Sequence, residues 1–106
     1  MVFEPMTIVN IGNAGVEIET PFPLQLDSLH QFRLSLGDLT VVVQGRIAHG
    51  HVGELRPEVA VYRSGVEFVE LSDHAVRAIR SFVRVYEGAA APGTILDGEI
   101  LGDEAP

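Results

Sequence analysis

The chain has 106 residues, the usual size of one domain, and a chain of this length buries roughly two-thirds of the surface that its unfolded form exposes. Hydrophobic residues make up 46% and charged residues 21%, which is globular rather than disordered composition. The net charge of −8 at pH 7 disfavours binding to nucleic acid or to anionic lipid, because both need an excess of cations. The absence of cysteine excludes disulfides, thiolate zinc sites and cysteine nucleophiles. A chain without cysteine is typical of the cytoplasm, which is therefore the expected location.

Membrane and secretory segments are also not expected. No apolar run approaches the roughly 18 residues that a membrane span needs, and the first residues, MVFEPMTIV, lack the basic region that opens a secretory signal.

In chain order, six short stretches rich in Val, Ile, Leu and Phe predict strands between turn signals. They are residues 7–10, 16–20, 32–36, 39–48, 58–62 and 65–70. The dipeptide at Gly37 predicts a tight hairpin between FRLSL and LTVVVQG, and residues 53–57 predict a longer connection. No helical pattern precedes residue 72, so parallel strands would lack crossover helices, and an antiparallel barrel or sandwich is expected.

A single helix is predicted to follow the strands. Ser72 is a candidate N-cap, and Asp73 in the first turn suits the helix dipole. Apolar residues then recur at helical spacing, at Val76, Ile79, Phe82, Val83 and Tyr86, and Gly88 is a stop signal. We expect this apolar stripe to cover one end of the barrel. Residues 89–106 are small, acidic and turn-prone, which predicts a loosely ordered tail after a domain that spans residues 1–88.

The stretch NIGNAGVEIET, residues 10–20, allows two interpretations. Its glycines could let backbone N–H groups approach a phosphate, or they could only relieve strain in a turn between two strands. The alternation in Val16, Glu17, Ile18 and Glu19 is typical of a strand with one buried face.

Two other clusters are candidates for function. His49 and His51 would share one face of a strand and, with Glu54, could hold a divalent metal, or they could be the polar end of a hairpin. On the predicted helix, three arginines recur on the side away from the apolar stripe, as a partner-binding ridge or as a solvated face; they are Arg77, Arg80 and Arg84. No motif for a catalytic nucleophile, a Walker loop or a metalloprotease is present, so an enzyme is not expected.

Together, NIGNAGVEIET and the later segment YRSGVEFVELSDHAVRAIRSFV resemble the PilZ domain family over about residues 7–85. The more specific part is Tyr62 to Asp73, where an aromatic residue, a glycine, an alternating strand and a Ser-Asp helix start follow in the family's order. The resemblance implies a mainly β fold, a six-stranded antiparallel β-barrel with one C-terminal α-helix. It also implies binding of the bacterial second messenger cyclic di-GMP, through which such domains switch motility, exopolysaccharide or virulence.

The family's ligand motifs are only partly present. Of the (Asp/Asn)-x-Ser-x-x-Gly turn, Asn10 and Gly15 match the first and last positions, whereas Gly12 replaces the serine and removes a hydroxyl that could bond the ligand. The family's RxxxR pair is not found, because none of the nine residues before Asn10 is arginine. Guanidinium groups suit both phosphates and guanine rings, so weakened binding of cyclic di-GMP is expected.

Three functional hypotheses follow. The preferred one is a non-catalytic PilZ-like adaptor that acts by protein–protein interaction, with weak or no binding of cyclic di-GMP and no cofactor. Its partner would bind an exposed barrel face, the arginine ridge or the tail. The second is a genuine cyclic di-GMP receptor in which Asn10, Gly12 and Gly15 contact the ligand. Its cation comes from Arg46, from Arg63 or from a second subunit. The third, and least supported, is a metal-dependent enzyme built on the histidines.

Overall fold

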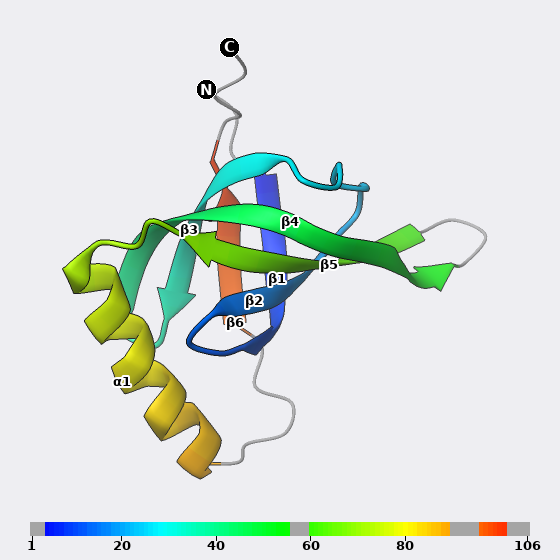
Figure 1. Ribbon diagram of the computed structural model, residues 1–106. Helices are drawn as coiled ribbons and strands as arrows, with labels where there is room; N and C mark the ends of the chain where they lie inside the picture. The colour runs from blue at the N-terminus through cyan, green and yellow to red at the C-terminus, as the bar shows by residue number, and fades with distance from the viewer. Residues whose placement is uncertain (1–3, 56–59, 90–95, 102–106) are drawn as a thin grey trace.

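Six strands form a closed antiparallel barrel in this computed structural model, which describes residues 4–55, 60–89 and 96–101 (Figure 1). The elements are β1 (Glu4–Ile11), β2 (Gly15–Thr20), β3 (Leu29–Leu36), β4 (Leu39–Leu55), β5 (Ala60–Val69), α1 (Asp73–Ala89) and β6 (Leu96–Ile100). Around the barrel the strands follow the order β1, β2, β5, β4, β3, β6. The predicted fold class, a six-stranded antiparallel barrel with one helix, is therefore confirmed.

Alternating side chains of each strand fill the barrel. On β3, Phe32 and Leu34 are completely buried. On β4, the side chains that point inward are at most 3% exposed; they are Val41, Val43 and Ile47. Because side chains alternate between the two faces of a strand, the intervening residues face solvent and carry most of the charges. The predicted two-residue hairpin is present: Leu36 pairs with Leu39, and Gly37 has a positive φ of 64°. Glycine adopts this left-handed conformation without steric cost.

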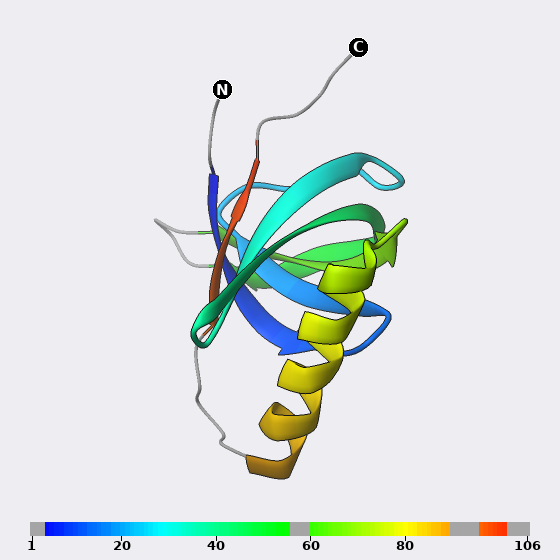
Figure 2. The same cartoon turned by 90° about the vertical axis from the view of Figure 1, so that its left-hand side faces the viewer.

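The helix completes the core. The backbone N–H of Ala75 donates to the Ser72 hydroxyl at 3.1 Å, so Ser72 is the N-cap that the sequence predicts. Ile79 and Val83 on one face of α1 belong to the same buried cluster as the barrel interior. Figures 1 and 2 show the helix lying against one side of the barrel. The expectation that the apolar stripe covers the barrel therefore holds for Ile79, Phe82 and Val83, while the side chain of Tyr86 lies outside the described residues.

Two predicted strands are one. Residues 58–62 and 65–70 were expected to be separate, but Ala60–Val69 form a single strand, and β4 continues to Leu55 instead of ending at residue 48. Bulges between Ile47 and His49 and between Val52 and Glu54 let the long strand keep pairing with β5. The two strands leave the barrel as a two-stranded arm, which projects to the right in Figure 1.

The sixth strand lies in the segment expected to be a loose tail. Residues 96–100 pair with β1 over five positions and with β3 over three, so they close the barrel, and α1 is not the last element. Ile100 is 4% exposed, and a Cβ on Gly98 would lie 2.6 Å from Met6 Cε and 2.7 Å from the Arg33 carbonyl oxygen. A glycine and two carboxylates in five residues hide this strand from a composition-based prediction. The domain therefore extends beyond residue 88, and the remaining tail residues, 90–95 and 102–106, lie outside the described ranges.

Candidate ligand-binding site

The glycine-rich turn joins β1 to β2. A bulge between Ile8 and Asn10 turns the end of β1, and the Gly12 N–H donates to the Gly15 carbonyl oxygen at 2.9 Å. Gly15 lies against β5, where an added Cβ would be only 2.2 Å from the Val66 carbonyl oxygen. A Cβ on Gly12 would have no neighbour within 4 Å. The first glycine is thus free of steric constraint, whereas the last is required by the close approach of two backbones.

This turn borders an open cavity of about 440 Å³ on the outer surface of the barrel. All three residues of the partial motif, Asn10, Gly12 and Gly15, line it. The other lining residues in the described part of the chain are Ala14, Val16, Glu17, Ala48, His49, Gly65, Val66 and Glu67. The structure therefore brings the three predicted ligand residues together, and it surrounds them with side chains that the sequence did not single out.

Strand register explains which side chains meet here. Asn10 pairs with Glu17, Glu17 with Gly65, and Gly65 with His49, so one row crosses four positions on β1, β2, β5 and β4. The His49 ring lies over Gly65, because a Cβ built there would be 2.1 Å from Nε2 and 2.4 Å from Cε1. The imidazole thus takes the space that any larger residue at position 65 would fill.

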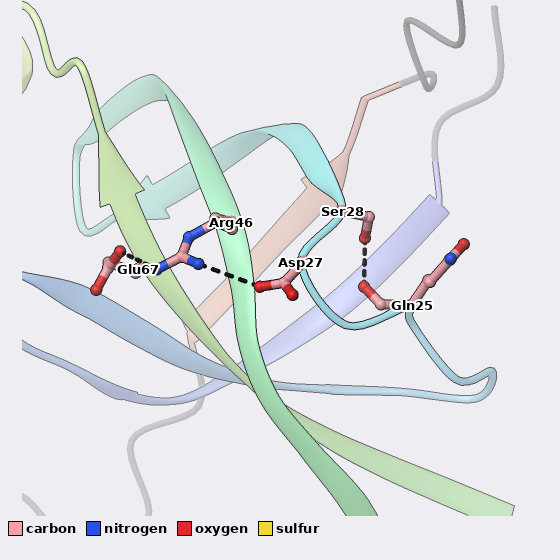
Figure 3. A network of polar contacts seen from close by, with 5 residues as sticks. All are labelled: Gln25, Asp27, Ser28, Arg46 and Glu67. Carbon is pink, nitrogen blue, oxygen red and sulfur yellow. Dashed lines mark hydrogen bonds and ion pairs between the residues drawn. The ribbon is translucent and has the colours of Figure 1, made fainter.

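The nearest candidate cation, Arg46, is engaged beside the cavity. Arg46 faces Glu67 across β4 and β5, donating to its carboxylate at 2.7 Å and to Asp27 at 3.1 Å (Figure 3). The hydrogen bond to Glu67 raises the pKa of Arg46, with the charges of both carboxylates adding to it. Arg46 is not among the lining residues of the cavity, whereas its partner Glu67 is.

The second candidate cation lies elsewhere. Arg63 donates to Glu19 from the neighbouring strand, and this bond raises its pKa. Its Nε is buried and has no acceptor in the described part of the chain. Arg63 lines a separate cavity, together with residues of the β4–β5 arm. Arg63 therefore does not line the cavity at the glycine turn, and its support of a ligand there stays a prediction.

Of the candidate metal cluster, the structure describes the side chains of His49 and His51, whereas that of Glu54 lies outside the described side chains. The register places His49 and His51 on the same face, opposite Gly65 and Arg63, as the sequence predicts. Within residues 4–55, 60–89 and 96–101, however, no group of three or more His, Asp or Glu side chains could hold a metal ion. The metal-enzyme hypothesis thus gains no support from the described side chains.

The helix arginines form the predicted ridge. Arg77, Arg80 and Arg84 are exposed on the side of α1 opposite the buried Ile79 and Val83. Among the side chains that the structure describes, no carboxylate lies within ion-pair distance of these three guanidinium groups. Three exposed positive charges therefore share one face of α1 in a chain whose net charge is −8.

The acidic character of the cavity could not be foreseen from the motif alone. Glu17 and Glu67 are 50 residues apart in sequence, and alternation predicts only that each faces solvent. Their shared position follows from the pairing of β5 with β2, in which Gly15 lies opposite Glu67 and Glu17 opposite Gly65.

Comparison with known proteins agrees with this architecture. The family model described as PilZ domain matches residues 3–84, more than half of the chain. No curated protein and no solved structure gave a significant match. No helix in the described ranges is long and apolar enough to cross a membrane. The strand order, the turn at Asn10 to Gly15 and the family match together establish that the chain belongs to the PilZ domain family.

Proposed function

We propose that this PilZ domain is a non-catalytic adaptor of cyclic di-GMP signalling whose own binding of cyclic di-GMP is weak or lost. PilZ domains are in general binding domains rather than enzymes, and the family is associated with this second messenger. The adaptor acts by contact with a protein partner.

The observation that carries the proposal is the charge of the cavity at the glycine turn. Cyclic di-GMP carries two phosphates, and two carboxylates, Glu17 and Glu67, border the cavity in which its motif residues meet. Like charges repel, and the effect is larger in a partly enclosed site than in bulk water. Arg46 is drawn toward Glu67 and Asp27, and Gly12 supplies no hydroxyl.

A second candidate, a genuine receptor, is favoured by one feature of the same site. The pair between Arg46 and Glu67 is solvent-exposed, with 41% and 52% of the two side chains accessible. Exposed ion pairs are weak and exchange easily with other partners. A phosphate could therefore compete with Glu67 for the guanidinium of Arg46.

The variant Glu67→Gln separates the two candidates. Removing the carboxylate releases Arg46 and lowers the negative charge of the cavity. The adaptor proposal expects undetectable or millimolar binding of cyclic di-GMP by the unaltered chain, and about tenfold stronger binding by the variant, the gain of one charge-assisted contact. Calorimetric titration measures both.

Asp38→Asn is the matched control, because it also removes one negative charge. Asp38 is exposed in the turn between β3 and β4 and is not among the residues that line the cavity. Equal gains in the two variants would reduce the effect to net charge. Tight binding by the unaltered chain, abolished by Arg46→Gln, would establish the receptor instead.

The partner surface that we propose is the arginine ridge, Arg77, Arg80 and Arg84. Support comes from their exposure and from the lack of carboxylate partners among the described side chains. Unpaired guanidinium groups on a rigid helix are suited to binding carboxylates in bidentate geometry. An acidic segment of a partner protein is the complementary chemistry.

A further inference from the structure

A second cavity, of about 290 Å³, lies between the β4–β5 arm and the segment that connects β2 to β3. Its apolar lining comes from both sides: Pro23, Leu24 and Leu26 from the connection, and Val52 and Tyr62 from the arm. Leu26 and Val52 are 57% and 52% exposed, so the unoccupied cavity leaves apolar surface in water. Such apolar surface at the edge of a sheet is a common feature of protein-binding sites.

Along this cavity, the edge of β4 that faces away from β5 has no strand partner among the described residues. The ladder between β3 and β4 ends where Leu29 faces Arg46, and the last contacts on that side join Ile47 to Asp27 and Ser28 at 2.8 and 3.0 Å. Beyond Ile47, β4 pairs only with β5 in the part of the chain that the structure describes. One edge of the arm is therefore open.

The open groups can be assigned from the register. Ile47 directs both its N–H and its C=O toward the β3 side, and polar groups of alternate residues point to opposite edges of a strand. The bulge after Ile47 adds one residue, so the next groups on the open edge belong to Gly50 and Val52. Both residues also line the cavity. Hydrogen-bonding groups and apolar surface thus occur together.

We propose that this edge binds an extended peptide segment of a partner protein by strand addition, with an apolar side chain of the peptide in the cavity. The added strand would bond the free N–H and C=O groups of Gly50 and Val52. Residues that alternate along the peptide would face Leu24 and Leu26 on one side of the sheet and His51 on the other.

Charge favours an acidic peptide. Apart from the Tyr62 phenol, the ionisable side chains among the described lining residues are His51 and Arg63, and no carboxylate is among them. One guanidinium nitrogen of Arg63 already bonds Glu19, while its Nε has no acceptor in the described part of the chain. The first cavity, by contrast, has Glu17 and Glu67 in its wall. An apolar residue flanked by glutamates therefore complements the arm, and this site is separate from both the glycine turn and the α1 arginines.

The test uses the full chain, isotopically labelled, and the synthetic peptide acetyl-TTELETT-amide. Its central leucine would face the cavity and its glutamates the opposite face of the sheet. Amide resonances of residues 48–52 and 24–26 are expected to shift on titration. Two further peptides carry backbone N-methyl groups, one at the leucine and one at both glutamates. Strand addition uses peptide N–H groups of one parity, so one methylated peptide should bind about tenfold more weakly while the other is unaffected.

On the protein side, Val52→Pro removes an N–H from the open edge, and Val52→Thr keeps it with nearly the same shape. Only the proline variant should lose the peptide. The methylated peptides keep the test decisive if the proline variant fails to fold. Equal binding of both methylated peptides, or no shifts at millimolar peptide, would overturn the proposal. So would shifts of residues 48–52 on concentrating the chain alone, which would assign the edge to a second copy.

Discussion

Glycines 12 and 15 occupy the same turn but have different surroundings. A Cβ added to Gly15 would lie 2.2 Å from the Val66 carbonyl oxygen, which is closer than any real Cβ contact. The backbone of β5 would have to move to make room for it. Gly12 has open space where its side chain would be. The residue types alone would assign both the same role, since a sequence shows a glycine but not what lies opposite it.

We therefore expect Gly15→Ala to lower the free energy of unfolding by about 2–3 kcal/mol, because β2 and β5 must separate to admit the methyl group. Gly12→Ala and Gly12→Ser should change it by less than about 0.5 kcal/mol. Urea unfolding followed by circular dichroism measures all three. Similar losses at both glycines would show that the turn itself, rather than the approach of β5, sets the requirement.

Other single residues show where sequence reasoning ends. Asn10 and Gly15 could be selected from the motif, and the structure does place them on one cavity. The ion pair between Arg46 and Glu67 could not be predicted from the motif, because it depends on which residues the strand register places opposite each other. Long-range pairing is information that local patterns do not contain.

At the scale of elements, the helix is the part that follows most directly from sequence. Its cap, its apolar stripe and its extent are all local properties, and the helix runs from Asp73 to Ala89, one residue beyond the expected stop at Gly88. The bounds of the strands were harder to predict from sequence. The sequence predicts a break between residues 62 and 65, but Gly65 lies inside the continuous strand β5, under the His49 ring.

The cap can be tested directly. Ser72→Ala removes the acceptor for the Ala75 N–H and should lower the free energy of unfolding by about 1 kcal/mol. Ser81→Ala, at an exposed position within α1, is the control and should be neutral or slightly stabilising, since alanine has the higher helix propensity. Thermal unfolding of the two variants distinguishes a cap from a general loss of serine.

Strand β6 gives a second prediction at this scale. A chain ending at residue 95 loses the buried side chain of Ile100, worth about 1.5–3 kcal/mol, and leaves the facing edges of β1 and β3 open. We expect a lower melting temperature and self-association, because open strand edges pair with other chains. A chain ending at residue 101 is the control and should match the full chain. A monomeric short form of unchanged melting temperature would show that β6 is dispensable.

Considered as a whole, the molecule separates its charges. The outer face of β2 and β5 carries Glu17, Glu19 and Glu67, while three exposed arginines project from α1. Composition gives the net charge of −8 and weak affinity for polyanionic nucleic acid, but not this distribution. The barrel topology determines it, by placing the carboxylate-rich strands beside each other.

The helix surface leads to a prediction about acidic partners. Hexaglutamate should bind weakly and be released by salt, shifting resonances of α1, because exposed charges are screened within about 10 Å at 0.1 M salt. Replacing Arg77, Arg80 and Arg84 by glutamine should abolish the shifts. Arg46→Gln is the control, since Arg46 is already held by carboxylates. Shifts that persist in the triple variant would exclude the ridge as the partner surface.

The central claim is that the cavity at the glycine turn no longer favours cyclic di-GMP. Calorimetric titration of the full, unaltered chain with cyclic di-GMP, at low and at moderate salt, tests it most directly. We predict no measurable heat below millimolar ligand at either salt concentration. Micromolar binding that weakens as salt rises would contradict the account, since it would mean that cations reach the ligand despite Glu17 and Glu67.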